Sequence, residues 1–235
     1  MFLGASEYVA DKFADAAIND IPYPHIQIDN IFPQQMYQQM LANEIPGEHL
    51  KTLHELQRVG SAYPESRKVL SLQHDMPELA DPYRLFWEQA ADWLLGPFYD
   101  IVIDKFHPHI SRRFNDEIPA MGPETLYTQD STTYNLGPHT DSVKKVITLL
   151  IYMPKDDSLS HLGTSMYIPT DKQFTCEGGP HHKFDRFTLL KTAPFKPNTL
   201  FGFFKTSNSF HGVEPIQESI RRDLLIYDIQ LTKNP

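Results

Sequence analysis

The sequence predicts an α+β protein whose helices pack on the outside of a jelly-roll β core. Up to about residue 100, apolar residues recur mainly with the spacing of a helix, whereas over residues 101–232 they mostly alternate with the period of a strand. The 19 prolines are scattered along 235 residues, which is typical of many short elements joined by turns. We therefore expect a single domain over residues 1–235, with a helical part over about 1–100 and a β core over about 101–232.

The first hundred residues predict three helices and one strand. Residues 7–18 and 33–45 carry amphipathic helical patterns, and residues 24–32 (PHIQIDNIF) alternate as a strand does. Asp81-Pro82 has the form of a helix start, because proline is favoured in the first turn of a helix. Gly96-Pro97 then predicts the end of that third helix.

The remainder of the chain predicts about eight strands, a number typical of a sandwich or a jelly-roll barrel. Residues 169–186 form the longest stretch without a strand pattern, and we expect either a lid over a functional site or an irregular hairpin connection there. The predicted strands are 101–106, 126–136, 146–153, 164–168, 187–193, 200–204, 210–216 and 224–231.

Composition argues against several functional classes. The net charge of −9 argues against nucleic acid as a partner, because binding phosphates requires clustered lysines and arginines. No window approaches the ~18 consecutive apolar residues of a membrane span. The N-terminus lacks the basic and apolar regions of a signal peptide. Cys176 is the only cysteine, so no disulfide can form within the chain, and we expect a cytoplasmic protein with no nucleic-acid or membrane partner.

The stretch NLGPHTDS contains the strongest chemical signal. His139 and Asp141 are two positions apart, so on a strand both side chains face the same side and can reach one metal ion. A third candidate ligand, His211, follows 72 residues later (211 − 139) at the start of a predicted strand. Two histidines and one carboxylate form the facial triad of non-heme Fe(II) oxygenases, which leaves three coordination positions open.

Arg221 adds a second signal, since it lies ten positions after His211 (221 − 211). A 2-oxoacid co-substrate that chelates iron through its keto-acid end leaves a second carboxylate free. A guanidinium binds such a carboxylate with two parallel hydrogen bonds. Arg221 is therefore the predicted anchor of the co-substrate.

The pattern resembles the 2-oxoglutarate/Fe(II)-dependent oxygenase superfamily, and most nearly its prolyl 4-hydroxylase-like branch. The resemblance covers roughly residues 125–232 and rests on GPHTD, KVITLLIYM, GTSMYIP, PNTLFGFF, FHGVEPI and RRDLLIYD. It implies a double-stranded β-helix core, and it implies His139, Asp141 and His211 as iron ligands. It also implies Arg221 as the anchor of 2-oxoglutarate, with the Tyr152 hydroxyl as a second contact to the same carboxylate.

One position departs from the pattern of the superfamily. Many relatives have a small hydroxyl residue two positions after the arginine, where this chain has Asp223. Because one carboxylate repels another, Asp223 is expected to face elsewhere, for example toward Arg222. Arg222 is therefore the alternative anchor.

The resemblance implies an Fe(II)- and 2-oxoglutarate-dependent dioxygenase that uses O₂ to hydroxylate a small-molecule substrate and releases succinate and CO₂. Two other interpretations stay open at this point. A zinc-dependent hydrolase on a jelly-roll barrel would need a general base beside the metal but would not need Arg221. A non-catalytic, cupin-like binding module would keep the barrel without turnover. His181 and His182, in the long loop, are further candidates for substrate contact, and the sequence leaves the oligomeric state undetermined.

Overall fold

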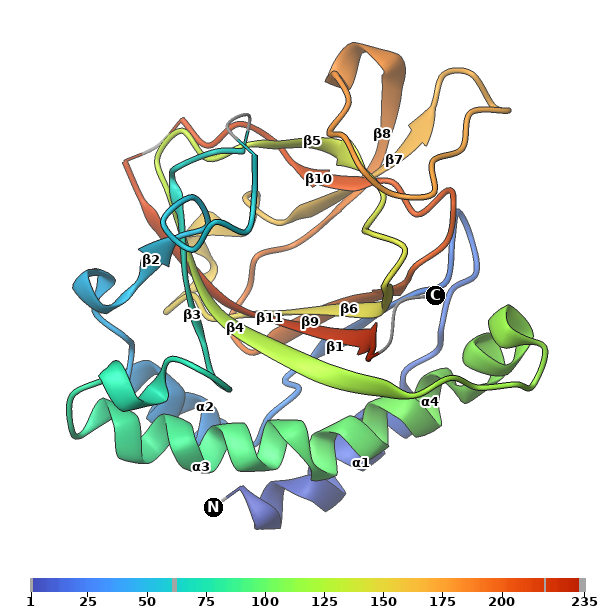
Figure 1. The fold of residues 1–235 in the computed structure, drawn as a ribbon. Coiled ribbons are helices and arrows are strands. Elements are labelled where there is room, and N and C mark those ends of the chain that lie inside the picture. The colour runs from blue at the N-terminus through green and yellow to red at the C-terminus, as the bar shows by residue number, and fades with distance from the viewer. Residues whose placement is uncertain (1, 61–62, 218, 233–235) are drawn as a thin grey trace.

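Two antiparallel β-sheets face each other in the computed structural model, which describes residues 2–60, 63–217 and 219–232 (Figure 1). The larger sheet has the strand order β1-β9-β6-β11-β4-β3-β2, and the smaller has the order β5-β10-β7-β8. This arrangement confirms the predicted α+β class with a jelly-roll core. The strands are β1 (His25–Asp29), β2 (Lys51–Thr52), β3 (Arg67–Ser71), β4 (Met121–Ser131), β5 (Leu136–His139), β6 (Lys145–Tyr152), β7 (Thr164–Pro169), β8 (Phe187–Ala193), β9 (Thr199–Phe204), β10 (His211–Val213) and β11 (Arg221–Leu231).

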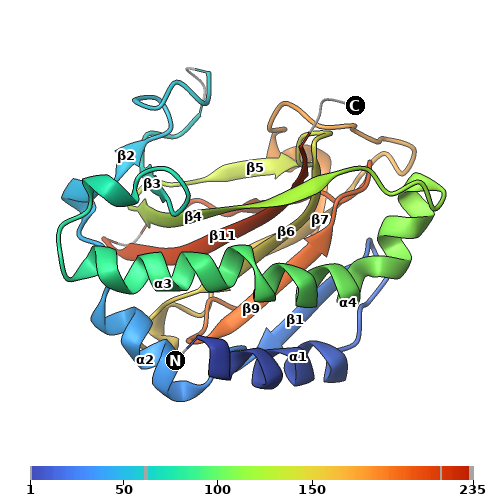
Figure 2. The same cartoon turned by 60° about the horizontal axis from the view of Figure 1, so that its bottom comes forward.

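Four α-helices cover the outer face of the larger sheet, on the side away from the smaller sheet (Figures 1 and 2). Their apolar faces and that outer sheet face together form the main hydrophobic core. The helices are α1 (Ser6–Asp15), α2 (Gln34–Ala42), α3 (Tyr83–Leu95) and α4 (Pro97–Phe114), with short 3₁₀ turns at Leu3–Ala5, Gly47–His49, Met76–Glu78, Asp157–Leu159 and Phe184–Arg186.

Strand β11, in the interior of the larger sheet, shows how each strand serves two environments. Successive side chains of a strand point to opposite faces. Leu225, Tyr227 and Ile229 point outward into the core beneath the helices. Leu224 and Ile226 point inward, into a second cluster between the sheets. Because the inner face looks toward the smaller sheet, inward-pointing polar residues of β11 are available to a site between the sheets.

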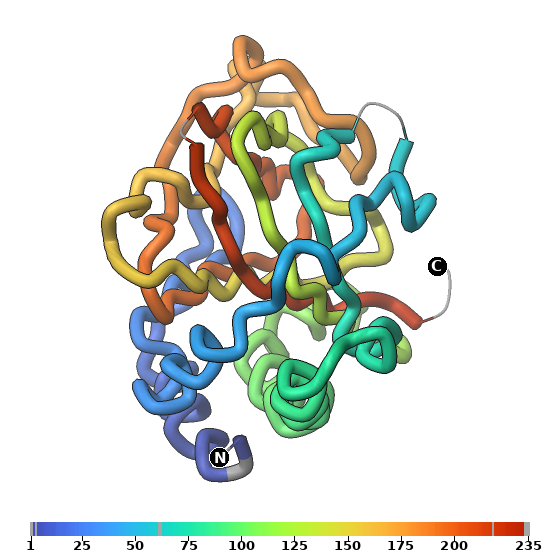
Figure 3. Tube along the Cα trace, turned by 90° about the vertical axis from the view of Figure 1, so that its left-hand side faces the viewer, coloured from blue at the N-terminus to red at the C-terminus, as the bar shows by residue number. Residues whose placement is uncertain are grey.

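Two loops lie at the side of the molecule opposite α1. One lies between β2 and β3 and is described over residues 53–60 and 63–66, and the other is the segment 170–186 that joins β7 to β8 (Figures 1 and 3). Both contribute residues to the cavity described below. Among the described residues, no helix combines the length and apolarity that spanning a bilayer requires.

The strand predicted over residues 101–106 is wrong, because this segment belongs to the 18-residue helix α4. The run Ile101-Val102-Ile103 is rich in β-branched residues, which favour strands. However, Phe98, Val102, Phe106 and Ile110 recur every fourth residue and are all fully buried, which is the pattern of one helix face. The Gly96-Pro97 pair that ends α3 also starts α4, with proline in the first turn.

Other differences concern strand boundaries. The predicted strand over 126–136 is interrupted, and its residues belong to the end of β4 and the first residue of β5. Strands β2 and β3 were not predicted, because both are short and lie in a polar segment. Their addition to the larger sheet brings a residue from the N-terminal third, Arg67, to the cavity between the sheets.

Candidate metal centre

His139, Asp141 and His211 converge at one end of the smaller sheet. Strands β5 and β10 pair antiparallel, with His139 directly opposite His211 in the register. Asp141 lies two residues beyond the end of β5 and turns back toward the two imidazoles. One ligand atom from each residue lies within 4.8 Å of the others, and all three residues are buried. The structure therefore brings together three predicted ligands that are up to 72 residues apart in the sequence (211 − 139).

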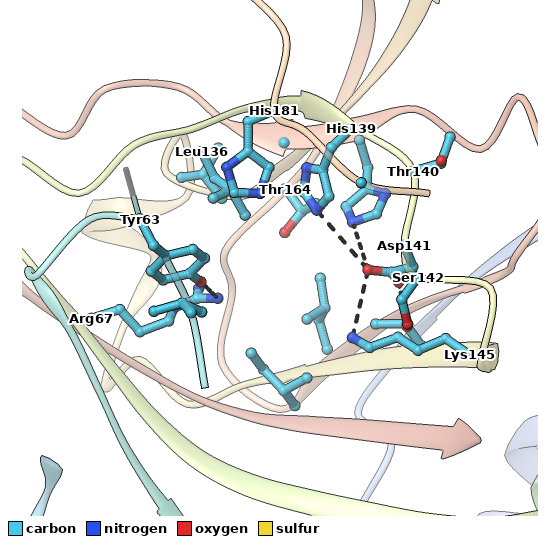
Figure 4. Close-up of a pocket in the computed structure, with 18 of the residues that line it drawn as sticks. Tyr63, Arg67, Leu136, His139, Thr140, Asp141, Ser142, Lys145, Thr164 and His181 are labelled. Atoms are coloured by element: carbon cyan, nitrogen blue, oxygen red, sulfur yellow. Dashed lines mark hydrogen bonds and ion pairs between the residues drawn. The ribbon is translucent and has the colours of Figure 1, made fainter. Parts of the chain in front are cut away.

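Backbone hydrogen bonds orient both imidazoles. The Nδ1 atom of His139 lies 3.0 Å from the carbonyl oxygen of Gly137, and Nδ1 of His211 lies 3.0 Å from that of Ser209. Since a carbonyl only accepts, each Nδ1 carries the proton and each Nε2 keeps a free lone pair. The two Nε2 atoms lie 4.0 and 3.9 Å from Oδ1 of Asp141 (Figure 4). The lone pairs and the carboxylate oxygen thus face a common centre.

The protonation states of these groups suit metal binding. Burial lowers the pKa of His139 well below its ordinary value, and the neighbouring His211 lowers it further. Burial likewise lowers the pKa of His211, although Asp141 partly opposes this. For Asp141, burial raises the pKa, but Lys145 and the two histidines outweigh burial and hold it below its ordinary value. At neutral pH the centre therefore presents two neutral imidazoles and an ionised carboxylate.

A buried polar network supports Asp141 from behind. The hydroxyl of Thr148, on β6, lies 2.7 Å from Oδ2 of Asp141 and 2.8 Å from Oδ1 of Asp228. Lys145 lies 2.8 Å from the other oxygen of Asp228 and 3.5 Å from Oδ1 of Asp141. Such partners hold a ligating carboxylate in place. None of these three residues was predicted from the sequence, although the alternation of β11 places Asp228 on its inner face.

A cavity of about 720 Å³ opens beside the three ligands and extends between the two sheets. Thr148, Leu150, Leu224 and Ile226 line its floor on the larger sheet. Arg222 lines it as well, together with residues of the two loops described above. Figure 4 shows His139 and Asp141 at one end of this cavity and Tyr63 and Arg67 at the other.

Two arginines and one aspartate form a row across three neighbouring strands. In the register of the larger sheet, Asp130 of β4 lies opposite Arg67 of β3 on one side and opposite Arg222 of β11 on the other. Arg67 donates to Asp130 through Nε (2.6 Å) and Nη2 (2.8 Å), and Arg222 donates through Nη1 (2.5 Å). Nε and Nη2 of Arg222 are buried and have no hydrogen-bond partner among the described residues. An arginine that is 0% exposed and lines a cavity therefore still has unused donors.

The structure places Arg221, the predicted anchor, away from the cavity. Arg221 points to the outer face of β11, where its side chain is 43% exposed and pairs with Asp223 and Glu44. It does not line the cavity. Asp223 also faces outward and accepts hydrogen bonds from Tyr127 and Gln129. Arg222 is the arginine that faces inward. The sequence predicted a pair between Arg222 and Asp223, but Arg222 pairs with Asp130.

Tyr152 and the loop histidines occupy different places. Tyr152 is fully buried and does not line the cavity; its hydroxyl accepts the N–H of Thr164 at 3.1 Å, and its ring lies beneath the Arg222 guanidinium. The His181 ring lies 4.6 Å from that of His139 and lines the cavity. His182 instead packs against Phe174, Phe187 and Phe210. Of the two histidines, only His181 is placed to meet a ligand in the cavity.

Comparison with known proteins gives similarity at the level of the fold. No family model matches the sequence, and no curated protein matches it. A prolyl hydroxylase from Trichoplax adhaerens, solved with a peptide fragment of hypoxia inducible factor, has a TM-score of 0.55 at 11% identity, covering 96% of this chain and 89% of that one. HygX from Streptomyces hygroscopicus, with nickel, 2-oxoglutarate and hygromycin B bound, has a TM-score of 0.53 at 11% identity, covering 97% and 86%.

A third similar structure is an oxidoreductase of the 2OG-Fe(II) oxygenase family from Burkholderia pseudomallei. Its TM-score is 0.51 at 11% identity, and the match covers 97% of this chain and 90% of that one. The matches span nearly the whole chain, and they agree with the jelly-roll topology described above. The chain therefore has the double-stranded β-helix fold of the 2-oxoglutarate/Fe(II)-dependent oxygenases.

Proposed function

We propose that this chain is a non-heme Fe(II)- and 2-oxoglutarate-dependent dioxygenase. In the proposed reaction it uses O₂ to hydroxylate a small-molecule substrate and releases succinate and CO₂. We further propose that residues 1–235 act as one domain, since the helices share a core with the sheet that lines the cavity. The fold neighbours support the choice of cofactors, because HygX was solved with nickel and 2-oxoglutarate bound.

The donor set at the metal centre fits Fe(II). His139 and His211 would each donate Nε2, and Asp141 would donate Oδ1, the oxygen that faces both imidazoles. Two imidazoles and one carboxylate on one side of a metal are typical of oxygenases that need the remaining positions for other ligands. A bound Fe(II) would supply the activation of O₂, which protein side chains cannot perform.

The observation that carries the proposal is the unpaired side of Arg222. Two guanidinium groups share the single carboxylate of Asp130, so this buried row has a net charge of +1 (two cations minus one anion). A buried charge without a partner is costly, so the row is complete only when an anion binds. The distal carboxylate of 2-oxoglutarate would supply that charge and accept from Nε and Nη2 of Arg222.

The cavity floor supports the same assignment. Leu150, Leu224 and Ile226 line the cavity together with Arg222 and the metal ligands. An apolar wall of this kind suits the two methylene groups of 2-oxoglutarate and excludes water from the reacting end. The Asp228–Lys145–Thr148 network would hold Asp141 in place while the other ligands exchange.

The zinc hydrolase explains fewer of these features. It would need a general base beside the metal, and His181 is the one described cavity residue with a ring close to His139 that is not itself a proposed ligand. A hydrolase gives no reason for an inward-facing arginine with unused donors. A non-catalytic binding module would likewise need neither the complete set of three metal ligands nor the arginine beside it.

Anaerobic titration of the protein with Fe(II) and 2-oxoglutarate tests the proposal. We expect the weak visible charge-transfer band of an iron–2-oxoglutarate complex in the parent protein and its loss in His211→Ala. His74→Ala, an exposed histidine outside the cavity, is the matched control and should keep the band. A parent protein that binds Fe(II) but shows neither the band nor succinate formation would rule the proposed function out.

A further inference from the structure

The end of the cavity opposite the metal centre is lined by side chains that belong neither to the metal centre nor to the Arg222 site. Arg58 and Tyr63 line it from the segment between β2 and β3, together with Arg67, the first residue of β3. Figure 4 shows Tyr63 and Arg67 together on that side, with Leu136 and His181 between them and the metal ligands. Under the proposed function, this end is where a substrate that reaches the metal would place its remaining atoms.

The charges that line the cavity oppose the charge of the whole molecule. The chain carries a net charge of −9, yet four cations line the cavity against one acid, because the other acids that pair with these cations (Glu124, Asp130 and Asp228) lie behind the cavity wall and do not line it. That acid, Asp141, is at the metal end, so no carboxylate among the described residues lines the opposite end. A cleft lined by cations attracts anions even in an acidic protein. The cations are Arg58, Arg67, Lys145 and Arg222.

Arg67 has hydrogen-bond capacity to spare at this end. Its Nε and Nη2 atoms are taken by Asp130, which leaves the Nη1 edge directed away from that carboxylate. The contact of Nη1 with the Tyr63 hydroxyl is long, at 3.4 Å. Tyr63 also stands 5.8 Å, ring to ring, from His181. The guanidinium of Arg67, the phenol of Tyr63 and the imidazole of His181 are thus neighbours in this part of the cavity.

Apolar residues connect the two ends. Leu136 and Val213, from β5 and β10, line the cavity between the metal ligands and the loop segments, and Val59 and Pro180 line it at the loops. The volume of about 720 Å³ lies in the range of pockets that bury a drug-sized molecule, so there is room beyond the co-substrate. An amine would find no acid with which to pair among the described residues that line the outer end.

We propose that the substrate is an organic carboxylate with an apolar body. Its carboxylate binds to the Nη1 edge of Arg67 and to Tyr63, with Arg58 at the cavity mouth, and its body lies along Leu136 and Val213 toward the metal. This inference rests on the proposed function and specifies its substrate class. Arg58 pairs with Glu124 at 2.8 Å and is 40% exposed, so it steers the anion while the more buried Arg67 binds it.

The test compares three ligands of the same shape and different charge: 3-phenylpropionate, 3-phenylpropionamide and 3-phenylpropylamine. Binding to the anaerobic Fe(II)–2-oxoglutarate protein is measured by calorimetry or ligand-observed NMR. We expect the acid to bind at least about tenfold more tightly than the amide, since a hydrogen bond between two charged groups is stronger than one to a neutral amide. The acid–amide ratio should fall toward one in Arg67→Met and decrease severalfold in Arg58→Gln.

Lys68→Met is the matched control, because Lys68 is the next residue of β3, points to the other side and does not line the cavity. Its acid–amide ratio should stay as in the parent protein. Equal binding of acid and amide would overturn the inference, and so would tighter binding of the amine or no binding of the acid. Displacement of 2-oxoglutarate by the acid would also overturn it, since the acid would then occupy the Arg222 site. Failure of 2-oxoglutarate itself to bind the parent protein would instead count against the proposed function.

Discussion

Arg221 and Arg222 are neighbours in the chain, but their side chains leave β11 on opposite faces. Arg221 meets Glu44 and Asp223 outside the sheet, whereas Arg222 meets Asp130 and the cavity. The sequence predicted that His139, Asp141 and His211 come together, because an i, i+2 pair and a distal histidine can be recognised from residue type and spacing. It did not reveal which arginine faces inward, because the register shift in β10 and the segment before β11 separate His211 from the arginines. The spacing between two positions gives only the number of residues that separate them. The face of the sheet on which a side chain lies depends on the register of the strand.

Exchanging each arginine for methionine separates the two positions. Arg222→Met removes the donors that face the cavity and leaves Asp130 to Arg67, so we expect the affinity for 2-oxoglutarate to fall by on the order of ten- to a hundredfold. Arg221→Met removes a partly exposed ion pair and should change that affinity less than about threefold, since such pairs contribute about 0–1 kcal/mol. Anaerobic titration of both variants measures the difference. The reverse ranking would restore Arg221 as the anchor.

At the scale of the element, the strands of the core were the easiest to predict. β6, β7, β8 and β9 lie within one residue of their predicted bounds, because they are framed by turn residues and rich in apolar side chains. The start of α4 was predicted as a strand because three adjacent residues there are β-branched, although the apolar residues of the longer segment repeat with the period of a helix. β3 was missed because a five-residue strand in a polar segment gives little signal. Because β3 was not predicted, its first residue Arg67, which lines the cavity, was not recognised either.

The 170–186 loop packs directly against the segment that carries the metal ligands. Thr140 donates to the carbonyl of Cys176, and the N–H of His182 donates to the carbonyl of Pro138. Gly178 has a φ of +126°, and a Cβ atom there would lie 2.6 Å from the carbonyl oxygen of Asp141. The loop can therefore approach Asp141 closely only because residue 178 is glycine.

Gly178→Ala should push the loop away from Asp141 and loosen the metal centre. We expect the affinity for Fe(II) or its substitute Zn(II) to fall by on the order of tenfold, and proteases to cleave the loop more readily. Gly179→Ala is the matched control: its φ is also positive, at +137°, but a Cβ there meets no atom within 4 Å. Metal titration and limited proteolysis of the two variants separate the clash from backbone strain. Equal effects would show that the close contact with Asp141 has no special role.

On the scale of the whole molecule, the site exists only when the two sheets are assembled. The smaller sheet provides His139 and His211, while the larger sheet provides Thr148, Asp130 and Arg222. The helices bury the outer face of the larger sheet and hold its inner face toward the cavity. The stability of the folded chain is therefore coupled to the protonation of buried site residues, and it should depend on pH accordingly.

The metal-free protein should lose stability as the pH falls below about 6.5. His139 and His211 have pKa values lowered by burial, while in the unfolded chain both have the ordinary histidine value of about 6.5. Between that value and the lower folded values, the unfolded state binds protons that the folded state does not, which favours unfolding by about 1.4 kcal/mol per pH unit and per histidine. Asp141 does not interfere in this range, because its lowered pKa keeps it ionised in the folded state, and the unfolded carboxylate titrates only near pH 4.

Urea unfolding of the metal-free protein at pH 7.5 and pH 5.5 measures this effect. The parent protein should lose more free energy of unfolding between the two pH values than the His139→Gln/His211→Gln variant, in which neither group titrates. Zn(II) should stabilise the parent more at pH 7.5 than at pH 5.5, because it binds the neutral imidazoles that protons compete for. A parent protein whose free energy of unfolding changes no more than that of the double variant would mean that the two imidazoles are not held neutral by burial. The metal centre would then lack the pre-set protonation state on which its donor set depends.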